Sequence, residues 1–420
     1  VCIGKGFGSY LRAEDRSSVV VGRDCRLSSD RYGKLVVEGL LATGCDVVDI
    51  GVCPTPILYF AIRHLKREGG VMVTASHNPP EYNGFKLCGG YDTLSGNQIQ
   101  KVRQIIEKDG FSVGSGQVET ADAVTPYKDL LLKNIKLSGT LRVGVDAGNG
   151  TAGFVAVPVL RGLGCEVFDI YCDMDGSFPN HESDPTVVEN MQDLITLVRE
   201  KRLDVGIGYD GDGDRIGVID EKGDIIWGDQ LMIMYAREIL SRKPGATFIS
   251  EVKCSQTLYD DIEKHGGRAI MWKTGHSLIK EKMKEIQAEL AGEMSGHMFF
   301  ADRYFGYDDA IYASCRLLEI LGVTGKAISE LLSDVPRTYT TPEIRVPCPD
   351  HRKFQVVNKV TEYFRQRQEI IDIDGVRVVF EDGWGLVRAS NTQPVLVLRF
   401  EALSAERLSE IRSEVESVLA

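Results

Sequence analysis

A pattern that occurs three times along the chain constrains its fold more than any other feature. In each copy a helical segment ends at a glycine and an apolar strand follows, which is how helices stop and strands begin in α/β units. Residues 41–50 and 160–170 match closely, and residues 262–271 form a weaker copy. The glycines Gly44, Gly164 and Gly266 stand 120 and 102 residues apart. That period is too long for a solenoid repeat and predicts one domain per copy.

The pattern of strands and helices predicts the fold class. Runs rich in valine and isoleucine, at residues 19–24, 141–146 and 203–210, alternate with longer helical patterns. This alternation predicts three similar α/β domains with mixed sheets that are covered by helices. Val1 falls inside a predicted helix that has neither a cap nor an initiator methionine, so we expect the natural chain to begin earlier.

The last part of the chain has a different pattern and predicts a small α+β domain. The elements expected there are a helix over 354–368, strands over 376–380 and 395–400, and an amphipathic helix from Ser404. The proline-rich residues 341–349 predict a linker into this domain, and the glycine-rich residues 110–116 predict a loop. The domain boundaries that we expect are 1–122, 123–224, 225–337 and 338–420.

Composition excludes several classes of protein. The 420 residues are enough for about two to four domains. Lys and Arg number 49 against 61 Asp and Glu, so the net charge of −12 argues against nucleic acid or an anionic membrane as a partner. No apolar run approaches the roughly 18–20 residues of a membrane span, and the first residues lack the shape of a signal peptide. The 10 cysteines include no Cys-x-x-Cys pair, so we expect buried, reduced thiols in a cytoplasmic protein.

The strongest motif is a run of three aspartates, Asp210-Gly-Asp-Gly-Asp-Arg215. Carboxylates at i, i+2 and i+4 leave an extended chain on one face, and the glycines between them let the backbone curl. Three clustered carboxylates repel one another unless a cation neutralises them, and their hard oxygen atoms suit Mg²⁺. We therefore interpret Asp210, Asp212 and Asp214 as metal ligands.

Three other interpretations of this motif compete. An EF-hand also begins with this spacing, but Arg215 stands where its turn glycine belongs, and the flanking residues resemble strands rather than helices. Residues 206–211 match the dinucleotide fingerprint, which requires a following helix where a strand is expected. A solvated Asp/Gly turn is the third alternative.

A second motif, Thr74-Ala-Ser-His-Asn-Pro-Pro80, follows an apolar strand and precedes Lys86. Ser76 at the end of a strand, on a loop stiffened by Asn-Pro-Pro, is held in an exposed position beside His77. An ordinary Asn-Pro turn remains the alternative. Next to a carboxylate site for Mg²⁺, a nucleophilic or phosphorylated serine becomes the better interpretation. The Gly-x-Ser-x-Gly elbow of α/β-hydrolases is absent.

Three further loops are weaker, and each could be an ordinary polar loop. The first pairs Lys253 with Lys273, Thr274 and Gly275 as candidate substrate-binding residues. In the second, Glu293 and Ser295 stand between glycines and could bind vicinal sugar hydroxyls. In the third, the candidate residues for a phosphate cradle are Arg388, Ser390, Asn391 and Thr392.

These five loops, in this order, resemble the α-D-phosphohexomutase superfamily over nearly the whole chain. The combination of Thr-Ala-Ser-His-Asn-Pro, Asp-Gly-Asp-Gly-Asp-Arg and Gly-Glu-Met-Ser-Gly-His is most similar to the bacterial phosphomannomutase/phosphoglucomutase branch. Phosphoglucosamine mutases usually carry Gln where this chain has Met294. The resemblance implies three α/β domains and a last domain like the TATA-binding-protein fold, arranged around a central cleft. The family also has an N-terminal Tyr-Asp-Ile-Arg-Gly loop, which is absent before Tyr10.

The resemblance also implies roles for individual residues. Ser76 would carry the phosphoryl group, and Asp210, Asp212 and Asp214 would hold Mg²⁺ together with Ser76. Lys86 and His276 match the proton-transfer candidates, and His77 and Arg215 would lie near the reacting phosphate. Glu293 and Ser295 would bind the sugar, Lys253 and His297 match further contact positions, and the loop of Arg388, Ser390, Asn391 and Thr392 would hold the nonreacting phosphate.

The implied activity is reversible phosphoryl transfer between O1 and O6 of mannose and glucose phosphates, through a hexose 1,6-bisphosphate that also acts as activator. The partners expected are hexose phosphates, and the chain would be a monomer or dimer. A phosphoglucosamine mutase is the second hypothesis. A non-catalytic protein that binds sugar phosphates is the third.

Overall fold

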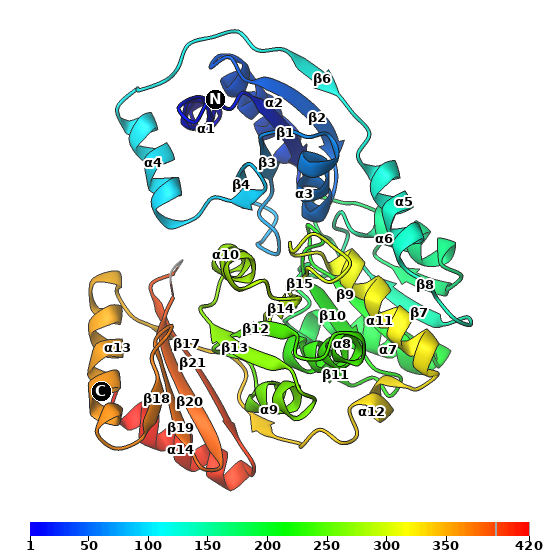
Figure 1. Ribbon diagram of the computed structural model, residues 1–420, viewed down its shortest axis with the longest axis vertical. Helices are drawn as coiled ribbons and strands as arrows, with labels where there is room; N and C mark the ends of the chain where they lie inside the picture. The colour runs from blue at the N-terminus through cyan, green and yellow to red at the C-terminus, as the bar shows by residue number, and fades with distance from the viewer. Residues whose placement is uncertain (391–392, 420) are drawn as a thin grey trace.

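The computed structural model describes residues 1–390 and 393–419 and contains four domains in chain order, each built on its own sheet (Figure 1). The first domain lies at one end of the molecule, and the fourth lies beside the third (Figure 1). The first three sheets mix parallel and antiparallel strands and the fourth is antiparallel, so the predicted fold class is confirmed.

The three-fold sequence pattern corresponds to the same turn in each of the first three domains. Gly44, Gly164 and Gly266 have φ of +81°, +99° and +80°, a left-handed conformation that glycine adopts without steric cost. Each follows the end of a helix and precedes a strand that pairs in parallel with its neighbour. The repeated pattern therefore marks the turn from a helix into a parallel strand.

In the first domain, parallel strands form most of the sheet and an antiparallel hairpin forms one edge. The strand order is β5-β4-β3-β1-β2-β6; β3 pairs in parallel with β1, and β4 pairs antiparallel with both β3 and β5. The predicted loop over 110–116 is present between the last helix and strand. The elements are α1 (Cys2–Arg12), β1 (Ser18–Arg23), α2 (Ser29–Leu41), β2 (Asp46–Val52), α3 (Thr55–His64), β3 (Gly69–Val73), β4 (Phe85–Gly89), β5 (Asp92–Thr93), α4 (Gly96–Glu107) and β6 (Val118–Thr120).

The second domain has the same plan, with strand order β11-β10-β9-β7-β8 and an antiparallel turn from β9 into β10. This turn contains the three aspartates. The elements are α5 (Val124–Asn134), β7 (Arg142–Asp146), α6 (Gly153–Gly162), β8 (Glu166–Ile170), the 3₁₀ helix η1 (Val188–Met191), α7 (Gln192–Lys201), β9 (Val205–Tyr209), β10 (Ile216–Ile219) and β11 (Ile225–Ile226).

The third domain has strand order β13-β12-β14-β15, in which only β15 is antiparallel. Its helix α10 also contacts the first domain, because Lys280 Nζ donates to Thr93 Oγ1 over 2.8 Å and Lys284 Nζ to Asp92 Oδ1 over 2.8 Å. The elements are α8 (Gly228–Arg242), β12 (Thr247–Glu251), α9 (Gln256–Lys264), β13 (Arg268–Trp272), α10 (His276–Ile286), β14 (Leu290–Gly292), β15 (Met298–Phe300), α11 (Ala310–Thr324) and α12 (Ile328–Leu331).

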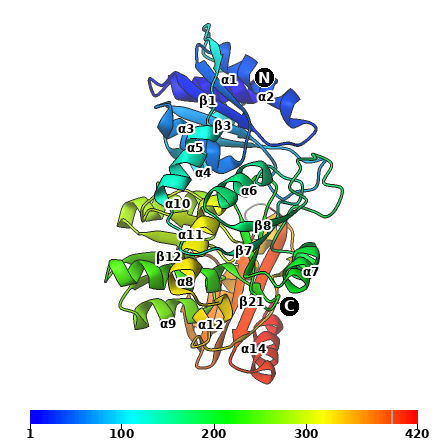
Figure 2. The same ribbon diagram turned by 90° about the vertical axis from the view of Figure 1, so that its right-hand side faces the viewer.

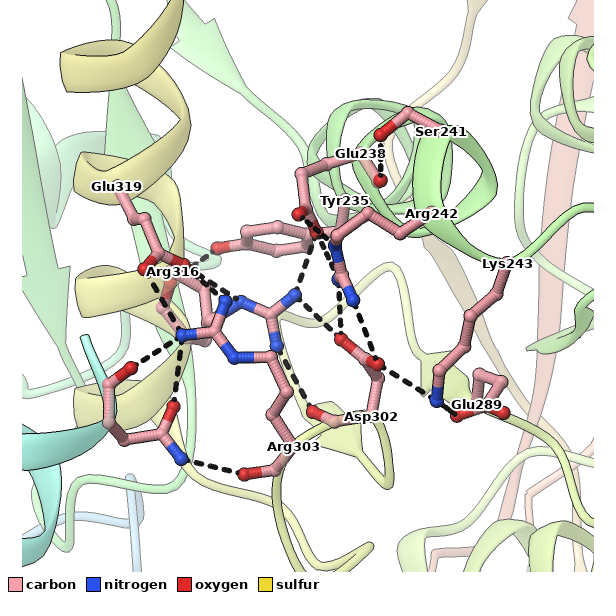
Figure 3. Close-up of polar contacts among 12 residues, drawn as sticks. Tyr235, Glu238, Ser241, Arg242, Lys243, Glu289, Asp302, Arg303, Arg316 and Glu319 are labelled. Carbon is pink, nitrogen blue, oxygen red and sulfur yellow. Dashed lines mark hydrogen bonds and ion pairs between the residues drawn. The ribbon is translucent and has the colours of Figure 1, made fainter. Parts of the chain in front are cut away.

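An ion-pair network fixes α8 and α11 of the third domain to the segment after β15 (Figure 3). Asp302 is fully buried and accepts from Arg242 Nη2 over 2.7 Å and from Arg316 Nη2 over 3.0 Å. Lys243 Nζ lies 3.0 Å from its other oxygen. Three cations thus surround the buried carboxylate of Asp302. Loss of this carboxylate would leave buried cations unpaired and would destabilise the protein.

The fourth domain is an antiparallel sheet with two helices on one face. The strand order is β16-β21-β20-β19-β18, and β17 also pairs with β21. Apolar residues of α13 and α14 pack with alternate residues of β19 to β21 in a separate core. The elements are β16 (Tyr339–Thr340), β17 (Ile344–Pro347), α13 (Asp350–Arg365), β18 (Glu369–Ile371), β19 (Val376–Phe380), β20 (Gly383–Ala389), β21 (Val395–Ala402) and α14 (Ala405–Ser417).

The predicted linker over 341–349 is wrong in part. Residues Ile344–Pro347 form strand β17, and Ile344 and Val346 pack against the core of the fourth domain. Proline is tolerated there because β17 lies at an edge: among the described residues it pairs with β21 and with no other strand. The sequence also did not reveal β20, because Gly383 and Gly385 interrupt its apolar pattern; a Cβ on Gly385 would meet the Phe400 ring at 2.9 Å.

Buried arginines join the fourth domain to the third. Arg377 Nη1 donates to the carbonyls of Val252 and Cys254, and its guanidinium lies 3.8 Å from the centroid of the Trp384 ring. Arg399 Nη1 donates to the carbonyl of Lys253. These contacts come from the face of the sheet that α13 and α14 leave uncovered, and Figure 2 shows the orange strands of this sheet partly behind the green domains.

All 10 cysteines are free thiols, as expected, and most are buried. Within residues 1–390 and 393–419, no helix combines the length and the apolar character that crossing a membrane requires.

Candidate active site

Ser76 lies just beyond the end of β3, in a loop that turns it toward the second domain. Its φ of +50° is in the left-handed region, which is uncommon for a residue with a side chain and marks a constrained position. Ser76 Oγ donates to Asp210 Oδ2 over 2.6 Å and lies 3.2 Å from His77 Nδ1. The serine and the aspartates, which the sequence separates by 134 residues, are therefore in direct contact.

The three aspartates occupy the turn between β9 and β10, and all are fully buried. Asp210 Oδ1 accepts from the backbone N–H groups of Asp214 and Arg215, each over 3.0 Å. Gly211 packs against the serine loop, since a Cβ there would meet the carbonyl oxygen of Ser76 at 2.5 Å. Strands on both sides of the turn exclude the EF-hand and the dinucleotide interpretations, each of which requires a following helix.

The aspartate cluster fits a metal ion. One oxygen from each carboxylate lies within 4.8 Å of the others. Asp212 Oδ1 and Asp214 Oδ1 are buried and have no hydrogen-bond partner among the described residues, which is costly unless another group satisfies them. Burial and the charge of Asp212 raise the pKa of both Asp210 and Asp214, so the three carboxylates by themselves resist full ionisation. A hard divalent cation would remove this strain and satisfy the free oxygens.

Lys86, on β4, is the ammonium group nearest to the cluster. Its Nζ donates to Asp212 Oδ2 over 2.7 Å and also contacts Asp214 Oδ2. Burial lowers the pKa of Lys86, but attraction to Asp212 and Asp214 outweighs burial and leaves the pKa above its usual value. Burial likewise raises the pKa of Asp212, but Lys86 outweighs this and holds that pKa below its usual range. Lys86 is therefore charged at neutral pH.

His276, at the start of α10, and His297, between β14 and β15, lie side by side over the cluster, with ring centroids 5.9 Å apart. Their Nδ1 atoms lie 3.6 and 3.3 Å from Asp308 Oδ2. Arg215 Nε donates to His297 Nε2 over 2.9 Å. Burial and the charge of Lys280 lower the pKa of His276 well below its usual value, so His276 is neutral at neutral pH.

His77, beside the serine, is also neutral. Burial and the charge of Arg215 lower the pKa of His77 to about 4. Arg215 acts on both His77 and His297. It donates a hydrogen bond to His297, and its charge lowers the pKa of His77. The predicted catalytic residues Ser76, His77, Lys86, Arg215 and His276 are thus linked by contacts or short-range charge interactions around the aspartates.

The described residues that were predicted to bind sugar or phosphate belong mostly to loops of the third and fourth domains, and several contacts join these loops. Glu293 is buried and accepts from the N–H of Gly275 over 2.8 Å. Asp374 Oδ2 accepts from the N–H of Thr274 and from Arg388 Nε, each over 3.1 Å, so one carboxylate joins two of the predicted loops. Lys253 Nζ donates to Glu343 Oε2 over 3.2 Å.

The remaining described candidates are Lys273, Ser295 and Ser390. Lys273 is exposed and Ser295 is half-buried. Ser390 Oγ accepts from the N–H of Gln393 over 3.2 Å. Asn391 and Thr392 lie outside the residues that the structure describes.

Sequence reasoning missed four charged residues that organise these loops: the buried Arg26, Glu251 and Asp308, and the half-buried Asp374. Glu251 accepts from the N–H of Lys253 over 2.7 Å and from Thr274 Oγ1 over 3.1 Å. No local motif distinguishes these residues, because each has at least one partner in a loop far away in the sequence. A weak signal exists for Asp374 alone, which precedes Gly375 in an Asp-Gly turn.

Four family models match the chain one after another. They are phosphoglucomutase/phosphomannomutase alpha/beta/alpha domain I over residues 1–113, domain II over 121–223, domain III over 227–339, and the C-terminal domain over 343–418. Together they cover nearly the whole chain in the order that the motifs indicated.

Full-length relatives agree with these matches. The chain is 46% identical over 412 residues to a phosphomannomutase/phosphoglucomutase of Pseudomonas aeruginosa, covering 98% of this chain and 89% of the relative. It is 43% identical over 422 residues to a phosphoglucomutase of Neisseria gonorrhoeae, covering 99% and 92%. A crystal structure of a family protein from Burkholderia thailandensis superposes with a TM-score of 0.94 at 42% identity, covering 100% of this chain and 92% of that one. The chain therefore belongs to the phosphoglucomutase/phosphomannomutase family of the α-D-phosphohexomutase superfamily.

Proposed function

We propose that this enzyme interconverts hexose 1-phosphates and hexose 6-phosphates by way of a phosphoryl group carried on Ser76. The observation that carries the proposal is the 2.6 Å contact between Ser76 Oγ and Asp210 in a buried cluster of three carboxylates. A phosphoryl group on this serine would therefore lie directly beside a carboxylate cluster that suits a divalent cation. Mg²⁺, when held by Asp210, Asp212 and Asp214, would supply the positive charge that balances a phosphoryl group there.

The reaction consists of two transfers in opposite directions. In the first, the free hydroxyl of the hexose phosphate attacks the phosphorus on Ser76, so that a new O–P bond forms as the Ser76 Oγ–P bond breaks. The hydroxyl proton passes to a base, and the product is a hexose 1,6-bisphosphate. After the sugar turns over in the site, Ser76 Oγ attacks the other phosphate and regains a phosphoryl group. The sum is the movement of phosphate between O1 and O6.

The charges assign different tasks to the two proton-transfer candidates. Lys86 is charged and occupied by Asp212 and Asp214, so it neutralises the cluster and is a poor proton acceptor. His276 is neutral and has an unpartnered Nδ1 among the described residues, 3.6 Å from Asp308. A neutral imidazole can accept the hydroxyl proton, and Asp308 would stabilise the imidazolium that forms.

Residues of the third and fourth domains would bind the rest of the substrate. Glu293 and Ser295 offer oxygen atoms to two sugar hydroxyls. Lys253, Lys273, Arg388 and the loop of Ser390 offer cationic or polar groups to the phosphate that is not reacting. This division suits an intermediate that turns over, since the serine side performs chemistry and the arginine side holds whichever phosphate is idle.

The test is a coupled assay of glucose 1-phosphate, mannose 1-phosphate and glucosamine 6-phosphate, with Mg²⁺ and catalytic hexose 1,6-bisphosphate. We expect turnover of the two hexose phosphates and one phosphate on Ser76 by mass spectrometry, which phosphatase removes. Preferred turnover of glucosamine 6-phosphate would instead indicate an amino-sugar mutase. No turnover and no phosphate on Ser76 would refute the proposal.

A further inference from the structure

Arg26 is a completely buried arginine that lies in the connection between β1 and α2, outside the group of residues that would touch substrate. Its side chain has 0% exposure. A guanidinium carries five N–H donors and no acceptor, so burial requires five acceptors in a fixed geometry. The structure supplies all of them. Asp24 Oδ2 accepts from Nε over 3.1 Å, and four backbone carbonyls accept from the two terminal nitrogens.

The four carbonyls all belong to the loop that carries Ser76. Nη2 donates to the carbonyl of Ser76 itself over 2.7 Å and to that of Asn78 over 2.6 Å. Nη1 donates to the carbonyls of Pro79 over 2.6 Å and Tyr82 over 3.2 Å. This loop is neither helix nor strand, so its inward carbonyls need donors from elsewhere. A single side chain thus donates to four carbonyls of the loop, in addition to the hydrogen bonds within the loop itself.

Arg26 also lies where this loop meets the second domain. The Phe178 ring lies with its centroid 5.0 Å from the guanidinium carbon, and the backbone of Arg26 forms a bridge with Gly176. On the other side of the loop, Gly211 of the aspartate turn packs against the Ser76 carbonyl. The carbonyl that Arg26 holds therefore lies at the close contact between the serine loop and the aspartate turn.

We infer that Arg26 is a positioning residue that fixes the Ser76 carbonyl and thereby holds Ser76 Oγ against the aspartate cluster during both transfers. The inference rests on the role of Ser76 proposed above. Ser76 must receive and release a phosphoryl group in two orientations of the same sugar, so its loop has to present the same geometry twice. Arg26 reaches the reaction only through the backbone of Ser76 and has no contact with the candidate sugar or phosphate residues in the hydrogen bonds described.

The decisive variant is Arg26→Lys, which keeps the positive charge but has three donors on one atom and cannot reach four carbonyls. Misplacement of a reacting group by about 1 Å costs on the order of 10²-fold in rate. We expect kcat to fall by about that factor. KM for glucose 1-phosphate should stay within about twofold, because the groups that would bind the idle phosphate belong to the third and fourth domains. A merely structural role would lower the amount of active enzyme without slowing the single-turnover transfer from phosphorylated Ser76.

The matched control is Arg23→Lys, three residues earlier, where the arginine pairs with Asp49 over 2.9 Å and touches no carbonyl of the serine loop in the hydrogen bonds described. It should retain normal single-turnover kinetics. If Arg26→Lys does not fold, Asp24→Asn is the second test. Asparagine has nearly the same shape as aspartate but lacks the negative charge that orients the Arg26 guanidinium through Nε. A kcat lowered about threefold or more at unchanged KM supports the inference.

Normal kcat in folded Arg26→Lys, or in Asp24→Asn where the lysine variant does not fold, would overturn the inference. A loss confined to KM would overturn it equally, because it would place Arg26 in substrate binding. The proposed function fails separately: if Ser76→Ala retains turnover, Ser76 is no phosphoryl carrier. If Ser76→Ala is inactive while Arg26→Lys is normal, only the positioning role is wrong.

Discussion

Replacing Lys86 by methionine removes the ammonium group from the aspartate cluster and keeps a side chain of similar length. Lys86 contacts two of the three fully buried carboxylates, Asp212 and Asp214. Loss of one partner from a buried ion pair typically destabilises a protein by about 3–5 kcal/mol, because the remaining charge stays buried and unpaired. We expect metal-free Lys86→Met to lose stability of about that size at pH 7.

The pH dependence of this loss has a definite sign. The folded pKa of Asp212 lies below its unfolded value, so the stability that Asp212 contributes is present above the unfolded pKa, about 4, and is lost as pH falls through the folded pKa. The variant lacks the cation that depresses this pKa. The stability difference between wild type and variant should therefore be largest near neutral pH and shrink below about pH 4.

The assay is chemical unfolding at pH 7 and at acidic pH, in EDTA and in Mg²⁺. A bound divalent cation replaces the lost positive charge, and a hundredfold lower Kd for Mg²⁺ in the variant would, at saturating Mg²⁺, stabilise it by about 2.7 kcal/mol more than wild type. Mg²⁺ should bind the variant more tightly and so recover much of the loss. The control is Lys34→Met, an exposed i,i+4 partner of Asp30, which should change stability by less than about 1 kcal/mol. Equal stability of Lys86→Met and wild type in EDTA at pH 7 would refute the reasoning.

Three other predictions follow from single contacts. Ser76→Ala should abolish mutase flux in the coupled assay while thermal unfolding stays close to wild type, and near-normal turnover would reject Ser76 as the carrier. Glu293→Gln should weaken sugar binding and raise KM, because an amide accepts fewer hydrogen bonds than a carboxylate; unchanged KM and kcat would remove Glu293 from the site. Asp302→Asn should cost about 3 kcal/mol or more in urea unfolding, because it leaves the cations of Figure 3 without their shared carboxylate, whereas the exposed Asp372→Asn should cost less than about 1 kcal/mol. Equal effects of these two substitutions would contradict the structural role of the network.

The predictions that held for the fold rest on features that act over a few residues. A glycine after a helix, followed by an apolar run, specifies the same local turn wherever it occurs, so Gly44, Gly164 and Gly266 revealed three related domains. The fourth domain was predicted less completely. Its strand β20 contains Gly383 and Gly385, where a side chain would collide with residues of the neighbouring strand, and glycine is not typical of a strand. Its strand β17 contains a proline, which is also untypical of a strand.

For the site, the sequence by itself determined the chemical groups, because Asp210, Asp212 and Asp214 stand at a spacing that converges within one turn, and because Ser76 stands at the end of a strand. Only the tertiary structure decided which groups meet. The contact of Ser76 with Asp210, the pairing of Lys86 with Asp212 and the hold of Arg26 on the serine loop join residues that no local pattern relates. The physical reason is that a hydrogen bond or ion pair between distant segments depends on how whole sheets pack, whereas a turn depends on its own backbone.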